Sequence, residues 1–553
     1  MDQTKYQHQN INDDDDELDS RLVSGAILEP DTAVASGGYE DDNESSPDSA
    51  NTTTTATTPI DLEAATSTLE DGANDDDDDD FDDFRLPSNP LLRTFFRVRN
   101  SKVSVLVSIS VALFCDMVCY GLVLPILPGV MEEKYHQSES VTGVLFAMFS
   151  AGSIISTPVF GSLSDKIGRK TPFLIGLISL IASTLMFAYG ESLWILFVAR
   201  FAQGVSSAVS WVVGLALIAD IYPPERLGTV IGSVVGGNAI GAPVGPLIGG
   251  ILYEHFGYRV PFLVACGITA FDLFIRLVFV SDDAIKRHKQ RKEAHVEKSL
   301  KAQDKDGAKA AAKEAARGQS FFKMAFNFKV IVLCLTIIIQ YACFAALEPT
   351  IPLYLKRTYN SSSTVISLMF ATMTLPAVFI APLSGKLADK VLGHFRTVLL
   401  GMVTVIFVYP FITFASHLWE TFVIVFILSA GLIMTNTPLM AVLTLTIDPH
   451  QYNEHNGKIA SLFNCCFCIG FFVGPILGSA IMDHVSFRWS NIVFTILLAI
   501  LSLLFFITFI KIILTSKFGP PQTSSSSEPP SNTTSDHKSG DQDILLDNIV
   551  EHE

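Results

Sequence analysis

Long apolar stretches separated by short polar segments fill the chain from Val103 to Ile513. Each stretch is close to the ~20 residues that a helix needs to cross a hydrocarbon core of ~30 Å. Because only helices satisfy every backbone group inside lipid, the pattern predicts an all-α membrane protein. Twelve spans are expected, six before and six after a long polar segment, near 103–128, 141–161, 172–189, 193–218, 227–252, 260–280, 328–355, 363–384, 397–415, 419–445, 458–481 and 490–513.

The two sets of six spans share short motifs, which indicates an internal duplication. Pro125–Pro128 recurs as Pro349–Pro352, 224 residues later. Gly161–Lys170 recurs at the same offset of 224 as Gly385–Gly393, with one extra residue before the second glycine. A duplicated membrane bundle predicts two pseudo-symmetric six-helix bundles that rock about a central site.

A third repeated motif is rich in glycine. Gly241–Gly250 recurs as Gly470–Ser479 at an offset of 229. Its glycines recur every fourth residue, which gives one helix a smooth face for close contact with another. Proline in the same helix is expected to bend it. Helix packing alone accounts for this spacing. The alternative is that Gly241, Gly245, Pro246 and Gly249 also take part in gating.

The acidic residues are concentrated in one segment outside the apolar region. The formal net charge of −18 comes from residues 1–84, where 26 Asp and Glu face only Lys5 and Arg21. Such an acidic segment cannot bury enough apolar surface to fold, although it could serve as a docking or sorting segment. We therefore expect a disordered acidic cytoplasmic tail (1–100), two six-helix bundles (101–281 and 327–514), a basic cytoplasmic linker (282–326) and a disordered cytoplasmic tail (515–553).

The basic residues near the span ends predict the orientation. They precede the first span, follow the second and eighth spans, and number 12 in residues 281–326. An even number of spans puts all of them on one side, so both termini are expected in the cytoplasm. Asp541–Leu546 resembles an acidic dileucine sorting signal, which leaves vacuolar or endosomal membranes and the plasma membrane both open.

Five ionisable residues fall inside the spans, where charge costs roughly 2.5–3.5 kcal/mol per residue on insertion scales. Asp116 lies mid-span, so it is a candidate proton carrier or cation partner, with a structural pair as the alternative. Glu348 is a second candidate, and Arg200 a counter-charge for either acid. Asp272 and Arg276 are spaced to neutralise each other, and Arg276 is expected to reach toward the cytoplasm.

The loop between the second and third spans has the residues of a gate. Gly161 and Gly168 permit a tight turn and a close helix approach. Asp165 can face the positive N-terminus of a neighbouring helix, and Arg169 can pair with a carboxylate. The basic residues could instead serve topology alone, but the second copy of the motif favours a gate. The matching residues of that copy are Gly385 and Asp389.

These motifs resemble those of one family. Gly161–Lys170 resembles the loop 2–3 signature of the major facilitator superfamily, and Arg200–Gly204 resembles its fourth-helix motif. Gly241–Gly250 resembles the fifth-helix motif of its proton-coupled drug antiporters. The resemblance covers residues 101 to about 514, with the motifs in order. It implies the fold of that superfamily and transport by alternating access.

Asp116 and the segment Glu348–Pro352 look like helices 1 and 7 of vesicular monoamine transporters and their fungal relatives. The resemblance implies that Asp116 meets a substrate amine and that Glu348 supports binding or coupling. That group has a Lys in helix 2 paired with an Asp in helix 11; here the matching residues are Phe149 and Asn464. Its helix 10 Asp matches Ile433 or the nearby polar Asn436.

The leading hypothesis is therefore a proton-coupled antiporter of small cationic or amphipathic organic solutes. The substrate-site candidates are Asp116, Glu348, Arg200 and Asn436. A proton-independent facilitator of a neutral solute and a non-transporting membrane sensor are the alternatives. All eight cysteines lie in apolar stretches, so neither disulfides nor a metal site is expected. We also expect no cofactor, no enzyme activity and no nucleic-acid partner, and a monomer whose partners are solute, protons and lipid.

Overall fold

The computed structural model describes residues 101–222, 224–279, 326–447 and 456–515, with the single positions 99 and 290. Regular structure within these residues is helical throughout. The predicted tails, nearly all of the predicted linker, and Asp541–Leu546 lie outside the described residues.

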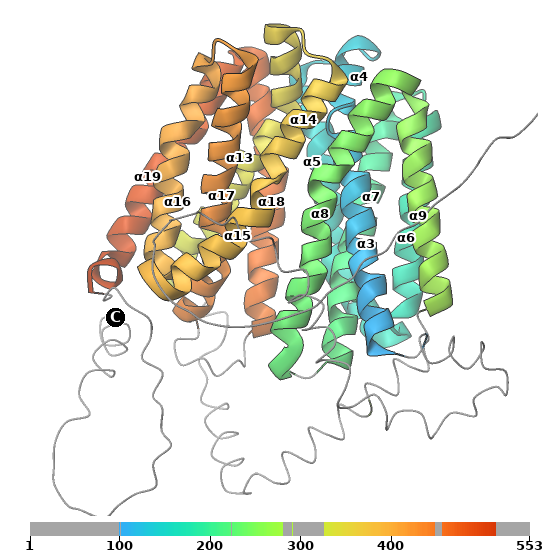
Figure 1. The fold of residues 1–553 in the computed structure, drawn as a ribbon, viewed down its shortest axis with the longest axis horizontal. Coiled ribbons are helices and arrows are strands. Elements are labelled where there is room, and N and C mark those ends of the chain that lie inside the picture. The colour runs from blue at the N-terminus through green and yellow to red at the C-terminus, as the bar shows by residue number, and fades with distance from the viewer. Residues whose placement is uncertain are drawn as a thin grey trace, which may run out of the picture. The chain divides into compact units, whose positions relative to one another are not determined.

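Each half of the protein contributes six membrane-spanning helices (Figure 1). The first half consists of α3 (Lys102–Val123) continued by α4 (Leu127–Glu133), then α5 (Glu139–Ile167), α6 (Lys170–Tyr189), α7 (Leu193–Ile221), α8 (Pro224–Phe256) and α9 (Arg259–Phe279). The second half consists of α13 (Phe328–Tyr359), α14 (Ser363–Thr374) continued by α15 (Pro376–Leu387) and a π-helical turn (Ala388–Leu392), α16 (His394–Val408) with a 3₁₀ turn (Tyr409–Phe414), α17 (Leu418–Ile447), α18 (Asn456–His484) and α19 (Phe487–Thr515).

The twelve predicted spans correspond one to one to these helices. Interruptions within spans occur at prolines, which lack an amide donor and clash with the preceding helical turn. Pro125 lies between α3 and α4, Pro376 begins α15, and Pro410 lies in the 3₁₀ turn after α16. In α8, by contrast, the helix continues through Pro243 and Pro246.

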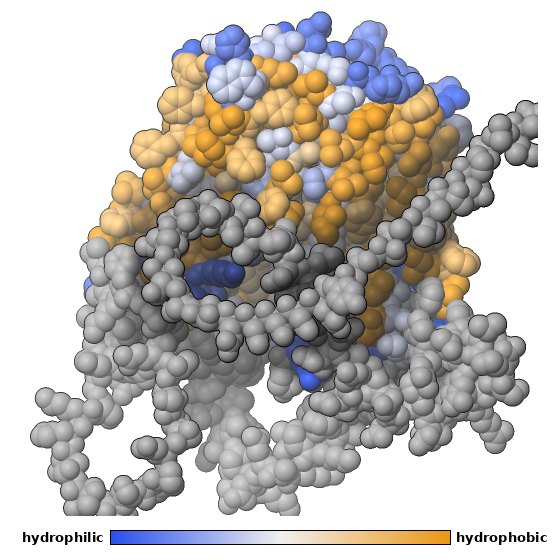
Figure 2. All heavy atoms as spheres, in the orientation of Figure 1, coloured by the Kyte–Doolittle hydropathy of each residue, from blue (hydrophilic) through white to orange (hydrophobic). Residues whose placement is uncertain are grey.

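A broad apolar surface surrounds the helices. Figure 2 shows hydrophobic residues over much of the visible face and hydrophilic residues along one end. Large exposed apolar side chains include Phe379, Phe407 and Ile500. Their exposure suits contact with lipid, so the protein is an integral, multi-pass membrane protein.

Apolar packing distinguishes the two ends of the bundle. One core cluster joins both halves and includes Leu127 of α4 and Leu355 of α13; we call this end the sealed end. At the opposite end, each half has a separate core, one around Leu217 and one around Phe505. We call it the open end, because the core clusters described there each belong to one half and do not join the two halves.

Two helix pairs make the most extensive packing between the halves, α5 with α18 and α8 with α14 (Figure 1). Within each half the strongest packing is also matched, because α3 lies along α8 as α13 lies along α18. The structure is therefore the predicted pair of pseudo-symmetric six-helix bundles.

Candidate functional site

A buried polar layer begins at Asp116 in the middle of α3. Its side chain is only 5% exposed. The hydroxyl of Ser207, on α7, donates a hydrogen bond to the Asp116 carboxylate at 2.6 Å. The carboxyl group is thus held between two helices of the first half, with a hydroxyl in place of a charged partner.

The second carboxyl group, Glu348 of α13, contacts the opposite half. Tyr120 lies one helical turn after Asp116, and its hydroxyl donates to the two carboxylate oxygens of Glu348 at 2.7 and 2.6 Å. Glu348 is 2% exposed. This contact joins the halves one helical turn after Asp116.

Arg200 of α7 lies beside this contact and is 0% exposed. Its guanidinium group is 4.8 Å from the ring centroid of Tyr120, 5.1 Å from Phe149 and 5.3 Å from Phe146. It donates to the Gln203 amide oxygen at 2.8 Å, while Nε and Nη2 have no hydrogen-bond partner among the described residues. Stacking on aromatic faces and nearby Glu348 therefore stabilise a buried cation.

Asn436 of α17 is not hydrogen-bonded to this group. Its Oδ1 atom is buried and lacks a partner within the described part of the chain. Of the four predicted substrate-site residues, the structure thus gathers Asp116, Arg200 and Glu348 around Tyr120, and leaves Asn436 outside that set of contacts.

The layer is closed to solvent in this structure. A hollow of about 430 Å³ lies elsewhere, at the sealed end of the first half. Its lining residues are Val130, Glu133, Lys134, Tyr253, Phe256, Tyr258 and Arg259.

The predicted gate motif of the first half ends α5. Gly168 follows the helix with a φ of +89°, a backbone conformation that favours glycine. The Arg169 guanidinium contacts Asp220, at the end of α7, at 2.9 Å, and the hydroxyl of Ser164 at 2.7 Å. The expected carboxylate partner of Arg169 is therefore Asp220. Gly161 and Asp165 lie in the last two turns of α5, and the Asp165 side chain is outside the described structure.

The second copy of the motif accommodates its extra residue in a π-helical turn, Ala388–Leu392. A π turn adds one residue to a helix without changing the elements on either side. Gly393 then takes a φ of +81°, as Gly168 does in the first copy. Asp389 is largely exposed and contacts His394 at 3.2 Å. Gly385 faces open space.

The glycine motif of α8 lies directly on α3. A Cβ at Gly241, Gly245 or Gly249 would be 2.8, 2.7 or 2.5 Å from a backbone oxygen of α3. The Pro246 ring packs at Gly121 of α3, where a Cβ would lie 2.6 Å from its Cδ. The predicted close helix contact is confirmed. Its counterparts on α18, which approach α13 in the same way, are Gly470, Gly474 and Gly478.

Asp272 and Arg276 of α9 form the expected pair, at 2.5 Å. The expectation that Arg276 reaches toward water was wrong, because its side chain is 1% exposed. Its guanidinium instead lies 3.8 Å from the Phe173 ring centroid. Neutralisation by Asp272 within the same helix allows the cation to stay inside the bundle.

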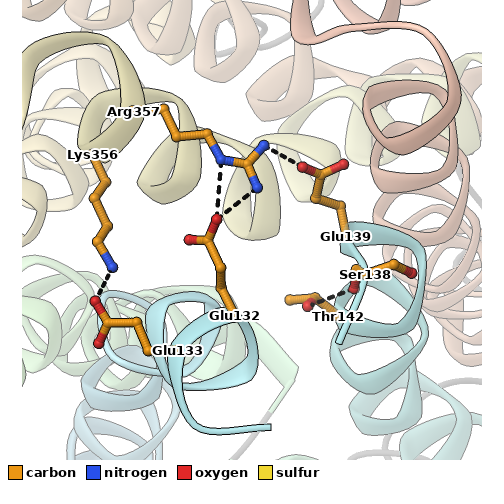
Figure 3. Close-up of polar contacts among 7 residues, drawn as sticks. All are labelled: Glu132, Glu133, Ser138, Glu139, Thr142, Lys356 and Arg357. Atoms are coloured by element: carbon orange, nitrogen blue, oxygen red, sulfur yellow. Dashed lines mark hydrogen bonds and ion pairs between the residues drawn. The ribbon is translucent and has the colours of Figure 1, made fainter. Parts of the chain in front are cut away.

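Ion pairs cross between the halves at the sealed end (Figure 3). Arg357 of α13 contacts Glu132 of α4 at 2.8 Å and also contacts Glu139 of α5. Lys356 contacts Glu133. Other hydrogen bonds between the halves lie at the ends of α8 and α18 and at Tyr120.

Sequence reasoning missed several of these residues. Tyr120 and Ser207 are uncharged, and polar residues of this kind are common in membrane helices. Asp220 follows a long apolar run, and a charged residue at the end of such a run is a sequence signal for a site. Its partner, Arg169, became evident only from the structure. Glu132 and Arg357 are charged residues in predicted loops, where charge is ordinary.

The comparisons with known proteins agree with the geometry. The family model described as Major Facilitator Superfamily matches residues 109–344 and 333–539. An "Uncharacterized MFS-type transporter C18.02" of Schizosaccharomyces pombe is 27% identical over 72% of this chain and 93% of its own length. The synaptic vesicular amine transporter of Homo sapiens is 26% identical, over 65% of each chain.

A solved structure also shares the fold. It is a bacterial homolog of the human lysosomal transporter Spinster, with a TM-score of 0.58 and 15% identity, covering 76% of this chain and 99% of that chain. The family model, the twelve spans and the paired bundles lead to one conclusion: the chain is a transporter that belongs to the Major Facilitator Superfamily.

Proposed function

We propose that this transporter exchanges protons for small organic cations of amine-like or drug-like character by alternating access. The observation that carries the proposal is the pair of buried carboxyl groups on opposite halves, Asp116 and Glu348, where Tyr120, one helical turn after Asp116, donates to Glu348. Similarity to vesicular amine transporters supports the substrate class. Neither acid has a direct ion-pair partner among the described residues, so each can change protonation without breaking a salt bridge.

Asp116 is the proposed exchange site. As a carboxylate it attracts a cation, and as a neutral acid it does not, so proton and substrate compete for one group. The Ser207 hydroxyl, which donates at 2.6 Å, stabilises the charged form and orients the carboxylate. Asn436, whose Oδ1 has no partner among the described residues, is proposed to accept a hydrogen bond from the solute.

Glu348 is the proposed coupling group. Its carboxylate accepts from Tyr120 across the two halves, and buried Arg200 supplies positive charge nearby. Protonation would weaken both interactions, because a hydrogen bond to a charged acceptor is roughly twice as strong as one to a neutral acceptor. The contact between the halves would then depend on the proton.

The gate motifs are proposed to control the open end. Arg169 and Asp220 fix the loop after α5 within the first half. In the second half, the exposed Asp389 beside His394 is proposed to exchange that contact for one with the first half when this end closes. The basic residues beside these motifs lead us to propose that the open end faces the cytoplasm. Both termini would lie there too, in a vacuolar, endosomal or plasma membrane.

Uptake driven by a pH gradient tests the proposal. Purified protein in vesicles that are acidic inside is given a panel of radiolabelled organic cations. Wild-type protein is expected to accumulate at least one cation. Uptake of that cation by Asp116→Asn is expected to be at least tenfold lower. Glu191→Gln, an exposed carboxylate in the loop between α6 and α7, is the matched control and should behave as wild type.

The other outcomes separate the alternatives. Uptake that ignores both the gradient and the Asp116 substitution would indicate a facilitator. No flux of any cation or neutral solute by folded protein would indicate a sensor. Either result contradicts the proposal.

A further inference from the structure

Two carboxylates at the sealed end each contact the start of a helix in the opposite half. Glu254, near the end of α8, accepts a hydrogen bond at 2.8 Å from the backbone N–H of Thr364 in the first turn of α14. Asp483, near the end of α18, accepts from the hydroxyl of Ser140 at 2.5 Å and from its N–H at 3.4 Å, in the first turn of α5. Each contact runs from one half to the other.

The two contacts are the same interaction repeated by the internal duplication. Ser140 and Thr364 are 224 residues apart, which is the offset of the other motifs of the first two helices. Glu254 and Asp483 are 229 residues apart, which is the offset of the glycine motif. The fifth helix of each half therefore caps the second helix of the other half, in both directions.

A carboxylate stabilises a helix start for two reasons. The first N–H groups of a helix have no partner within the helix, and the helix dipole places partial positive charge there. Here the capping group and the capped helix belong to different halves. The stabilisation therefore exists only while the sealed end is closed, and is lost when the halves separate there.

Tight seams beside the two caps have the same symmetry. A Cβ at Gly143 of α5 would lie 2.6 Å from the Cβ of Ser479 on α18. A Cβ at Gly250 of α8 would lie 2.7 Å from the Cβ of Ser367 on α14. These small residues let the helices approach closely enough for the carboxylates to reach the helix starts.

The ion pairs of the sealed end differ from these caps. Both cations, Lys356 and Arg357, come from α13, and their counterparts on the first half are all carboxylates. These pairs are at least partly exposed, as Glu254 and Asp483 are, so exposure does not separate the two kinds of contact; their arrangement does. They have no counterpart related by the duplication among the described residues.

We infer that Glu254 and Asp483 are a matched pair of latches that hold the sealed end closed. Each latch caps a helix of the opposite half, and the two contribute equally to the equilibrium between the closed and open forms of this end. The inference depends on neither the substrate nor the proton, so it stands or fails apart from the proposed antiport.

Distances between spin labels on the two halves measure this equilibrium. One label pair, at Glu191→Cys and Val485→Cys, reports on the sealed end. A second pair, at Gly228→Cys and Val391→Cys, reports on the open end. Both pairs are placed on a Cys465→Ser background, because Cys465 is the exposed native cysteine of the described residues.

Removing one cap is expected to lower the ratio of closed to open sealed ends about fivefold, the effect of losing a typical N-cap. Glu254→Ala and Asp483→Ala should give similar factors, because each removes a carboxylate that accepts from the first turn of a helix in the opposite half. The double variant should approach the product of the two, about 25-fold, since distant sites add. The open-end pair should shift in the opposite direction.

Glu420→Ala is the matched control. Glu420 also caps a helix start at the sealed end, accepting from the N–H groups of Ser416 at 2.7 Å and His417 at 3.2 Å, but entirely within the second half. Its loss should leave both distance distributions unchanged. An unchanged ratio in the double variant, a strongly unequal effect of the two single variants, or broadening at both ends through loss of packing would each overturn the inference.

Discussion

Helices α3 and α13 occupy equivalent places in the two halves and pack in the same way, yet their buried polar residues differ. Gly245 approaches Val118 of α3 as Gly474 approaches Ala342 of α13, with the same offsets of 229 and 224. The position equivalent to Asp116, however, is Gln340. The position equivalent to Glu348 is Leu124, which is buried and apolar.

This difference separates the residues that pack the helices from the residues that carry buried charge. Residues that build the helix seams and the caps of the sealed end occur twice, because both halves must move as matched rigid bodies. The buried charges of Asp116 and Glu348 occur once, as the proposed single exchange site between the halves requires. Substitutions at repeated and unrepeated positions should therefore fail in different ways.

The largest effect is expected at a repeated position. Gly245→Leu would force a side chain into the backbone of α3, and no rotamer can avoid that clash. We expect several kcal/mol of destabilisation and little monodisperse protein in size-exclusion chromatography. Gly474→Leu should fail equally. Gly232→Leu, at a glycine of the same helix with no close neighbour, is the control and should yield folded protein.

Glu348→Gln is expected to have the next largest effect. It would leave the buried Arg200 cation without a nearby negative charge and replace the charged acceptor of the Tyr120 hydroxyl with a neutral one, and a hydrogen bond to a charged group contributes about 1.5–3 kcal/mol. Thermal unfolding should therefore shift to lower temperature, and gradient-driven uptake should disappear. Adding Arg200→Met should recover much of the stability but none of the uptake. An unchanged unfolding midpoint in the single variant would show that Arg200 does not depend on Glu348.

Tyr120→Phe sharpens the comparison, because it keeps the ring beneath Arg200 and removes only the hydroxyl that reaches Glu348. Loss of a hydrogen bond to a charged group costs about 1.5–3 kcal/mol. We expect uptake to fall about tenfold, in keeping with 1.4 kcal/mol per factor of ten. Tyr135→Phe, which removes a hydroxyl contact with the Gly190 carbonyl at 3.3 Å, should cause much less change.

The smallest effect is expected at Gln340, the counterpart of Asp116. Its side chain is fully buried, and neither amide atom has a partner among the described residues. Replacing an unsatisfied buried polar group with an apolar one of similar shape is nearly neutral or stabilising. Gln340→Leu should keep gradient-driven uptake and unfold at the same or a higher temperature. A clear loss of stability would mean that the Gln340 amide forms a hydrogen bond in the membrane-embedded protein.

The helical architecture was predictable because apolar length and repetition are direct consequences of the bilayer. The interruptions coincide with prolines such as Pro125 and Pro376, but other helices continue through prolines such as Pro158 and Pro349, so the sequence alone did not place the breaks. The extra residue in the second gate motif was visible in the sequence, but its accommodation as a π-helical turn was not. A one-residue insertion can be absorbed by a turn, a bulge or a shifted helix, and only packing decides among them.

The candidate site was predictable where charge made it costly. Asp116 and Glu348 stand out because a carboxyl group inside an apolar span needs a reason. Their neighbours Tyr120 and Ser207 do not stand out, since a lone hydroxyl can bond to its own helix backbone. The error at Arg276 had the same origin, because sequence position indicated a route to water while Asp272 and Phe173 offered a better environment inside.

Proton release on substrate binding tests the central claim most directly. Purified protein in weakly buffered detergent solution is mixed with an organic amine that is taken up in the gradient assay, and the pH change is followed with an indicator dye. Wild-type protein is expected to release protons when the amine binds, and Asp116→Asn is expected to bind the amine without release or not at all. Binding without any proton release by wild-type protein, or release that persists in Asp116→Asn, would contradict exchange at this carboxylate.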